Sequence, residues 1–484
     1  MKRRRWDILL TLMNRLKVII IFPLIVSAIS SCVNSNVVFK PDKQEVKQDK
    51  RILQGAESEE PEATAEVEQP QEEEKEAEAE QIEVKEEAPS ESDQVNKRIL
   101  VVSQDGSGDY RKIQDALDRS QPGDTIQVKD GVYVERVDFN RSGTRELPIA
   151  LINYPDHSPV IDPGGGSYPV DCCPSGGTPR VEFNAEWIIL EGFEIRYGWD
   201  GVKLYQGHNT VRNNWIHHNL YQGILVVSTG EVLMAGNVIE YNGTDPNTCV
   251  RGDGNPSPKH CHGIYMSDYL CSGPSDITIR SNRISNHGGR GIQWNGNGCD
   301  TVMAGTLVEN NIIENNSWGM TLYHNVEGSV IRNNTFVLEW NPDTNDSTHA
   351  FVGIWNSTGN AFYNNIFFTT RGDVRALIGE TASTDQNIFD HNIWRVSEQS
   401  WMWNDEWLGD FNSKYEATAG DSYSDATSAN PGFMDLENGD YHLTSTSDAK
   451  DSGNDEECSR MDYDYESRGQ DGSCDIGAFE FNEF

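Results

Sequence analysis

The sequence predicts an all-β solenoid in which short parallel strands stack as the turns of a coil, a β-helix. A repeated unit carries this prediction. Its form is x-Ile-x-x-Asn-x-Ile-x-x-Asn, then a short polar turn and Gly-Ile-x-apolar, and variants of it occur in the segments Thr210–Val227, Ile277–Trp294, Thr306–Asn325, Ser329–Phe336 and Asn360–Phe367. The unit alternates apolar and polar positions over short runs separated by turns, which is typical of short strands.

Seven asparagines mark the period of the repeat. They lie about 23 to 45 residues apart, at Asn214, Asn237, Asn282, Asn311, Asn334, Asn365 and Asn392. Periods in this range indicate a solenoid or a propeller. The copies are short for four-stranded propeller blades and show no regular Asn-Gly hairpin turns. Three parallel strands for each turn of a coil are therefore the prediction.

Asparagine has a structural role in such a coil. Equivalent residues of successive turns lie about 4.8 Å apart, which is the spacing of neighbouring strands. Asn tolerates the left-handed backbone of a tight corner, and its amide can bond the Asn above and below it as a ladder. We therefore interpret the pairs Asn310–Asn311 and Asn315–Asn316 as structural, not as a sugar-binding site.

A short helix is expected near the start of the folded region. Asp109 is suited to the N-cap position, and the side chains of Ile113, Ala116 and Leu117 form an apolar stripe at helical spacing.

Three segments outside the repeats carry a resemblance to a known superfamily. They are the opening Val101–Val137, its continuation Gly143–Asp162, and the ending "DYHLTSTSDAKDSG…DIGAFEF". Together with the repeats, they resemble the right-handed parallel β-helix superfamily, which contains pectate lyases and related carbohydrate enzymes. The resemblance covers about residues 99–481. It implies a short helix that caps the open end of the coil, repeats over about 181–395, and a C-terminal capping region over about 396–481. One fold hosts many functions, so it implies the fold more strongly than the reaction.

The N-terminal residues read as a targeting segment. A basic start, the apolar run Val18–Ile29 and the ending Ile-Ser-Ser-Cys are typical of a secretory signal, and the ending resembles a bacterial lipobox. We expect residues 1–31 to be removed and lipid to be attached to Cys32, which would place the protein at the outer membrane or cell surface; an ordinary signal peptide or an uncleaved anchor is the alternative. Residues 32–98 would form a disordered tether, since Gly55–Gln94 has 17 acidic residues, two lysines and no aromatic residue.

The charge of the chain excludes one class of partner. The net charge is −38, the first 54 residues carry +7 and Gly55–Gln94 carries −15, so residues 95–484 carry −30. Nucleic acid needs a basic face and is therefore not an expected partner. The sequence specifies no cofactor, although its acidity is compatible with Ca²⁺. We expect a monomer.

Eight cysteines remain after Cys32 and fit an exported protein with disulfides. Cys458 and Cys474 could join the C-terminal end, but eight cysteines allow 105 connectivities, so no pairing is assigned. A zinc site built from Cys249, His260, Cys261 and His262 is the alternative, although this spacing fits no standard finger.

A ligand of a solenoid binds along an outer face. In the superfamily named above, the groove follows the strand after the polar turn, here Gly-Ile-x-apolar. Alternation predicts inward side chains at Val202, Ile224, Ile264, Ile292, Met320 and Ile354. It predicts an outward column of Lys203, Leu225, Tyr265, Gln293, Thr321 and Trp355, and a second one of Tyr205, Ser267, Asn295 and Tyr323. Aromatic rings stack on sugars, so the expected substrate-binding residues are Trp199, Tyr205, Gln293, Trp318, Tyr323, His324 and Trp355.

Two chemistries fit such a face. A polysaccharide lyase removes the proton α to a uronate carboxylate and needs a base and a positive group. We predict Arg290 as the carboxylate clamp, His262 or Tyr265 as the base, and Lys203 as a further catalytic candidate. A glycoside hydrolase needs two carboxylates, for which Asp200 and Asp268 are the candidates.

Two further activities are weighed against these chemistries. The methylesterase motifs Asp-Phe-x-Phe-Gly and Arg-Pro-Trp are absent from the sequence, and no Gln-Asp falls within the repeats at about 181–395, which excludes pectin methylesterase. A non-catalytic glycan-binding protein or adhesin remains open. β-Elimination of an extracellular acidic polysaccharide is the leading hypothesis.

Overall fold

A computed structural model describes residues 97–165, 181–244, 260–296, 298–339, 349–380, 387–396, 401–403, 406–407, 422–424, 431–469 and 472–482. All of them lie in one unit, Val95–Phe484. The predicted signal segment, Cys32, the predicted tether up to residue 96, and Cys172, Cys173 and Cys249 lie outside the described residues. Among the described residues, no helix has the length and hydropathy of a membrane-crossing segment.

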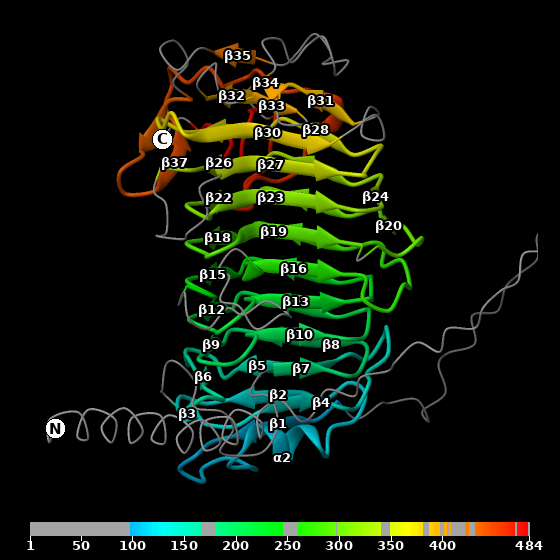
Figure 1. Ribbon diagram of the computed structural model, residues 1–484. Coiled ribbons are helices and arrows are strands. Elements are labelled where there is room, and N and C mark those ends of the chain that lie inside the picture. Colours follow the sequence, from blue (N-terminus) through cyan, green and yellow to red (C-terminus); the bar gives the residue numbers. More distant parts are fainter. Residues whose placement is uncertain are drawn as a thin grey trace, which may run out of the picture. The chain divides into compact units, whose positions relative to one another are not determined.

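In the described residues, three sheets of eleven strands each run along the coil, and Figure 1 shows their strands stacked one above another. Sheet A contains β1 (Ile99–Val102), β2 (Thr125–Val128), β5 (Ile149–Asn153), β8 (Ile188–Glu191), β11 (Thr210–Arg212), β14 (Leu233–Ala235), β17 (Thr278–Arg280), β21 (Leu307–Glu309), β25 (Val330–Arg332), β28 (Ala361–Tyr363) and β31 (Ile388–Asp390). Sheet B contains β3 (Val132–Tyr133), β6 (Val160–Ile161), β9 (Glu194–Arg196), β12 (Trp215–His217), β15 (Val238–Glu240), β18 (Arg283–Ser285), β22 (Ile312–Glu314), β26 (Thr335–Val337), β29 (Ile366–Phe368), β32 (Ile393–Arg395) and β35 (Ser422–Ser424).

Sheet C is the sheet that follows the polar turn of the repeat. It contains β4 (Val137–Phe139), β7 (Val181–Phe183), β10 (Val202–Leu204), β13 (Ile224–Val227), β16 (Ile264–Ser267), β19 (Arg290–Asn295), β23 (Trp318–Tyr323), β27 (His349–Trp355), β30 (Val374–Glu380), β33 (Trp401–Trp403) and β34 (Glu406–Trp407). Its strands pair in parallel except β34, which pairs antiparallel with β33. The predicted all-β parallel solenoid is confirmed.

The described residues also contain helix α2 (Ile113–Leu117), two small sheets and a 3-10 helix. The small sheets are the pair β20 (Met303–Ala304) with β24 (Val326–Glu327) and the pair β36 (Phe433–Asp435) with β37 (Asp440–Leu443), and the 3-10 helix spans Asp455–Glu457.

The core of the coil consists of the inward side chains of the three sheets, mostly Val, Ile, Leu and Phe. All six residues of sheet C that were predicted to point inward are buried. Burial of such branched side chains contributes about 1.5–3 kcal/mol each. A second apolar cluster lies on sheet B, where residues such as Ile312 and Ile366 pack against Tyr441 and Phe479 of the C-terminal segment. Cys458 and Cys474, which the sequence left as one possible pair, form a disulfide that joins two parts of that segment.

The asparagine ladder is confirmed, and the first and second residues of each pair, such as Asn310 and Asn311, have different structural roles. The second member is buried, and its backbone N–H donates to the side-chain oxygen of the equivalent Asn in the next turn at 2.9 to 3.1 Å. The first member takes the left-handed corner, as at Asn310 and Asn333 with φ of 54° and 50°. The ladder satisfies buried backbone donors that would otherwise destabilise the fold.

A second ladder lies at the corner before sheet C, and one of its members is histidine. Asn219 N–H donates to Asn242, Asn242 N–H donates to Nδ1 of His287, and His287 N–H donates to Asn316, at 3.0 to 3.1 Å. Burial lowers the pKa of His287 to about 3. The neutral ring therefore has its proton on Nε2, which is buried without a hydrogen-bond partner.

The substitution His287→Asn should reduce the acid sensitivity of the fold. Because the folded-state pKa lies below the ordinary value of 6.5, the unfolded chain binds a proton that the folded chain does not between pH 6.5 and about 3. Stability is thus lost as pH falls, by roughly 1.4 kcal/mol for each pH unit. Denaturant unfolding at pH 7 and pH 4.5 should show a wild-type loss that exceeds the variant's by roughly 3 kcal/mol. Equal losses would contradict this role.

The N-terminal helix exists, but its predicted cap is wrong. Helix α2 spans Ile113–Leu117, and its three predicted stripe residues are buried. The N-cap residue is Lys112, three positions after Asp109, and it makes no side-chain cap. The carboxylate of Glu135 accepts the first two helical N–H groups instead, at 3.0 and 3.1 Å. Asp109 accepts the N–H of Val101. A long-range acceptor has therefore replaced the local cap.

Candidate active site

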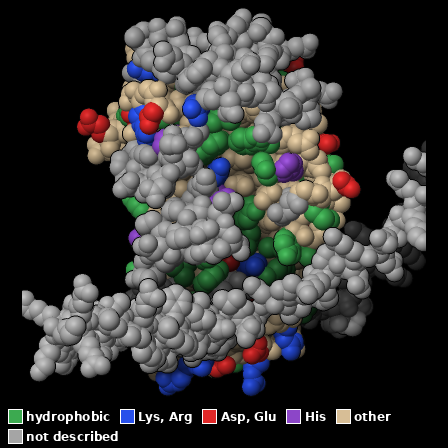
Figure 2. Space-filling view, in the orientation of Figure 1, with side chains coloured by type: hydrophobic (Ala, Val, Ile, Leu, Met, Phe, Trp, Pro, Cys, Tyr) green, Lys and Arg blue, Asp and Glu red, His purple; other side chains and the backbone are tan. Residues whose placement is uncertain are grey.

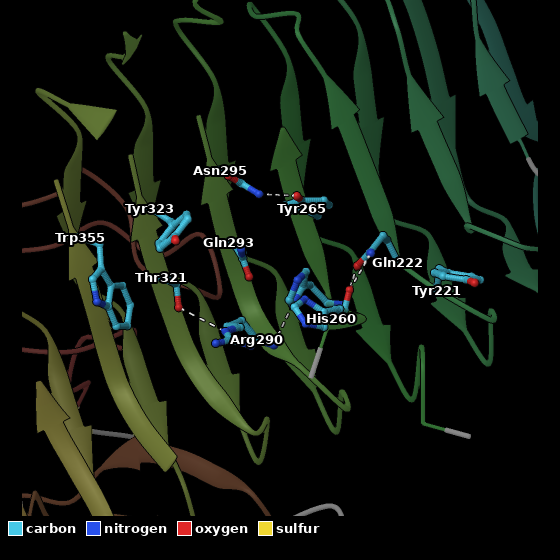
Figure 3. A pocket seen from close by; sticks show the side chains of 11 residues that line it. Tyr221, Gln222, His260, Tyr265, Arg290, Gln293, Asn295, Thr321, Tyr323 and Trp355 are labelled. Atoms are coloured by element: carbon cyan, nitrogen blue, oxygen red, sulfur yellow. Dashed lines mark hydrogen bonds between the residues drawn. The ribbon is translucent and has the colours of Figure 1, made fainter. Parts of the chain in front are cut away.

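A cavity of about 490 Å³ opens on the outer face of sheet C, over β16, β19, β23 and β27. Figure 2 shows this face, with hydrophobic, basic and histidine side chains at its surface. The cavity is lined by Tyr221, Gln222, His260, His262, Tyr265, Arg290, Gln293, Asn295, Thr321, Tyr323 and Trp355 (Figure 3). Six of these are predicted site residues, namely His262, Tyr265, Arg290, Gln293, Tyr323 and Trp355.

The strand register builds two outward columns. One contains Tyr265, Gln293, Thr321 and Gly353, and the other contains Ser267, Asn295, Tyr323 and Trp355. Trp355 was predicted in the first column, level with Thr321, and this placement is wrong. In the sequence, Gly353 and Ile354 resemble the Gly-Ile that follows the polar turn of the repeat. In the structure, Gly353 lies inside β27, two residues beyond the position that is equivalent to Gly319 of β23. Val352, not Ile354, therefore pairs with Met320.

Arg290 begins β19 and faces the cavity. Its guanidinium lies 4.8 Å from the ring centroid of Trp318, and its Nε donates to the hydroxyl of Thr321 at 3.4 Å. Stacking on the indole holds the planar guanidinium in place. Arg290 can therefore present N–H groups to a carboxylate in the cavity.

Tyr265 lies on the neighbouring strand, with its side chain toward Asn295. Its hydroxyl accepts a hydrogen bond from the Asn295 side chain at 2.8 Å. Burial raises the pKa of Tyr265, while hydrogen bonds with Asn295 and Ser267 oppose that shift. The phenol can thus exchange a proton with a ligand, and the protonated form predominates at neutral pH.

His262 does not suit the role of base. Its Nδ1 accepts the backbone N–H of Arg290 at 3.0 Å, which occupies the lone pair that a base would use. Burial lowers the pKa of His262 well below its usual value, and the charge of Arg290 lowers it further. The ring is therefore neutral, with its proton on Nε2. It anchors the start of β19.

Lys203 shares the outward face of sheet C but not the cavity. The register places it two strands from Tyr265, with Leu225 between them. Its Nζ lies 4.8 Å from the ring centroid of Tyr205, which also lies outside the cavity.

The remaining predicted aromatic residues border the cavity without lining it. Trp199 stacks on Tyr221 with ring centroids 4.6 Å apart. Trp318 is buried beneath Arg290. His324 packs edge-on against Tyr323 beyond the end of β23.

The two predicted hydrolase acids are buried and do not line the cavity. The carboxylate of Asp268 accepts the N–H groups of Ser272 and Gly273 and the hydroxyl of Thr301, so it holds a turn together. Asp200 is also buried, and its carboxylate accepts the N–H of Gln222 at 3.4 Å. Among the described lining residues there is no carboxylate. That part of the site has no acid pair for hydrolysis.

The described residues also offer no cluster of three or more His, Cys, Asp or Glu side chains that could hold a metal ion. They do not fit a Ca²⁺ site of carboxylates, and we derive no step through one. Cys261 is disulfide-bonded and has no thiolate for zinc. Cys271 pairs with Cys299 and joins the loops after β16 and β19.

Comparison with known proteins identifies the fold. A family model described as "Right handed beta helix region" matches residues 181–367. The fold is a right-handed parallel β-helix. No curated protein matched the chain.

Several solved structures are similar to this chain at low sequence identity. Pectate lyase Pel9A is 16% identical with a TM-score of 0.54, over 80% of this chain and 97% of that one. An alginate lyase from Paenibacillus is 15% identical with a TM-score of 0.36, over 62% and 87%. The surface adhesin PfbA of Streptococcus pneumoniae is 13% identical with a TM-score of 0.41, over 61% and 75%. The similarity to Pel9A shows the fold alone.

Five lining residues of the β-helix were absent from the predicted site, namely Tyr221, Gln222, His260, Asn295 and Thr321. Asn295 and Thr321 stand in the predicted outward columns and could have been included by alternation. Tyr221 and Gln222 stand directly before Gly223, in the same place as the predicted residues Trp199 and Asp200 before Gly201, so the repeat could have indicated them. His260 was named from the sequence only as a ligand of the alternative zinc site, and no pattern pointed to it as a lining residue of the cavity.

Proposed function

We propose that this protein cleaves an acidic polysaccharide by β-elimination in the sheet C cavity. One observation carries the proposal: the described cavity brings the guanidinium of Arg290 and the phenol of Tyr265 together with amides and aromatic rings, without a carboxylate. Residues 95–484 carry a net charge of −30. The cavity differs from this acidic background because its described lining contains an arginine and no acid, so it is locally suited to an anion.

The proposed reaction assigns each group a role. A uronate carboxylate binds Arg290, and the amide N–H groups of Gln293 and Asn295 add donors for the charge that develops on it. Tyr265, as phenolate, takes the proton from the carbon α to the carboxylate. The C–H electron pair forms a carbon–carbon double bond, and the bond to the glycosidic oxygen breaks. The phenol then returns its proton to the leaving oxygen.

The full chain should be incubated with a panel of uronate polysaccharides and neutral polysaccharides. Ultraviolet absorbance of the unsaturated product and new reducing ends would be followed together. A rise in both on an acidic substrate supports the proposal. New reducing ends without absorbance would make the protein a hydrolase, and binding without either would make it a glycan-binding protein.

The substitution Arg290→Lys tests whether Arg290 binds the substrate carboxylate through its planar guanidinium. Arg290→Lys keeps the charge but loses the planar fork, so we expect kcat/KM on the acidic substrate to fall by about tenfold or more. Lys203→Ala is the control, because Lys203 lies outside the cavity and its loss should change kcat/KM by less than about threefold. A larger effect at Lys203 than at Arg290 would contradict the assignment.

Export and lipid attachment at Cys32 are also proposed, on the basis of the signal-like residues 1–31 and the Ile-Ser-Ser-Cys ending. Metabolic labelling with a fatty acid should mark the wild-type protein and not Cys32→Ser. Equal labelling of both would remove this proposal.

A further inference from the structure

Gly353 lies in the middle of β27, at the outward column that carries Tyr265, Gln293 and Thr321 on the other strands. A Cβ atom at this position would lie 2.4 and 2.8 Å from ring atoms of Trp355 and 2.9 Å from a ring atom of Trp318. These distances are too short for carbon atoms in contact. The glycine therefore makes room for two indoles.

The two indoles continue the site from Arg290. Trp318 is 5% exposed, with the Arg290 guanidinium on its ring. The ring centroids of Trp318 and Trp355 are 5.9 Å apart, and the centroid of Tyr323 is 5.9 Å from that of Trp355. Trp355 lines the cavity and is partly exposed, and Figure 3 shows its indole beside Thr321 and Arg290. Trp318 thus contacts both the Trp355 indole and the Arg290 guanidinium, and it links the two.

We infer that Trp355, seated on Gly353 and Trp318, is the floor of a pyranose-binding subsite that adjoins the Arg290 site, and that Gly353 positions this floor. The inference rests on the proposed function, because it concerns the same cavity. Indole rings stack on the apolar face of a sugar ring, and a platform held on both sides loses little entropy on binding.

The geometry also sets the minimum size of the ligand. Tyr265 and Gly353 are separated by three strand spacings, about 14 Å. A single pyranose is too short to contact both ends. The ligand that uses the whole cavity is an oligosaccharide, with an acidic unit at Arg290 and a further unit on Trp355.

The test compares Gly353→Ala, Trp355→Ala and the double variant in the full chain. The matched control is Gly372→Ala, since a Cβ there meets no atom within 4 Å. The probes are acidic oligosaccharides of increasing length, prepared from the polysaccharide that the wild-type protein cleaves or binds. Kd is followed by tryptophan fluorescence and calorimetry, with kcat and KM where cleavage occurs, and thermal unfolding is recorded for each variant.

We expect each single variant to weaken binding of the longer oligosaccharides by about tenfold and to leave the affinity for short ones unchanged. The double variant should lose no more than Trp355→Ala alone, because Gly353 acts through Trp355. Additive losses, or equal losses for short and long probes, would overturn the inference. Unchanged affinity in both single variants would also overturn the inference. In that case, cleavage by the wild type would still support the proposed function. If the wild type neither binds nor cleaves any acidic probe, both ideas fail.

Discussion

Replacing Tyr265 with phenylalanine is expected to lower kcat/KM for elimination by about 10²- to 10⁴-fold, the usual contribution of a general acid–base group. The substitution removes only the hydroxyl that accepts from Asn295. The ring and its neighbours remain, so most of the affinity for the polysaccharide should persist. Initial rates and equilibrium binding on the same substrate would measure the two effects separately.

The role of Tyr265 as base also predicts how the elimination rate changes with pH. Burial raises the pKa of Tyr265 above its ordinary value of 10, so the phenolate is a minor species at neutral pH. The rate should therefore increase with pH by about tenfold per unit, up to the pKa of the phenol. Residual activity of Tyr265→Phe should lack this slope. Tyr205→Phe is the matched control, because Tyr205 lies outside the cavity. A slope that survives in Tyr265→Phe would assign the base to another group.

Replacing Asn311 with alanine is expected to destabilise the fold by about 3–5 kcal/mol, the largest stability effect that we predict from one side chain. The Asn311 oxygen accepts the backbone N–H and the side-chain amide of Asn282, and its own amide donates to Ile279 O and to Asn334. All these groups are buried, so truncation leaves several of them without partners. Each unsatisfied buried group costs about 1–3 kcal/mol.

Denaturant unfolding of the full chain, followed by circular dichroism, would measure this loss. Asn213→Gly is the control, because Asn213 is exposed, bonds Glu191 at the surface, and has a left-handed φ of 55° that glycine tolerates. The control should shift stability by less than about 1 kcal/mol. Similar losses at both positions would mean that the ladder adds no more than a surface hydrogen bond.

Local patterns were sufficient to predict the coil, because its contacts repeat at the period of the sequence. Each Asn of the ladder meets the equivalent Asn one turn away, so spacing along the chain predicts contact in space. Alternation within a strand likewise placed Tyr265 and Gln293 outward and Ile264 and Ile292 inward, because side chains on a strand alternate between two faces.

Predictions failed where contact joined positions outside the repeat. Asp109 is a good N-cap by type, but Glu135, more than twenty residues away, accepts the helical N–H groups. Asp268 has the chemistry of an acid catalyst, but its carboxylate is used by the turn that it closes. His262 has the chemistry of a base, but the backbone of Arg290 takes its lone pair. No pattern of residue types records which hydrogen bonds a polar side chain has already made.

The sequence by itself determined the coil, the asparagine ladder and the outward face on which the candidate site lies, because all three follow from the period of the repeat. Only the tertiary structure decided which outward residues share one cavity. Gly353 resembles a turn residue in the sequence, yet the register of β27 places it beneath Trp355 and beside Trp318. Register depends on the number of residues in each turn of the coil, and that number varies from one turn to the next. The packing of complete neighbouring turns, not the local pattern, therefore sets the site.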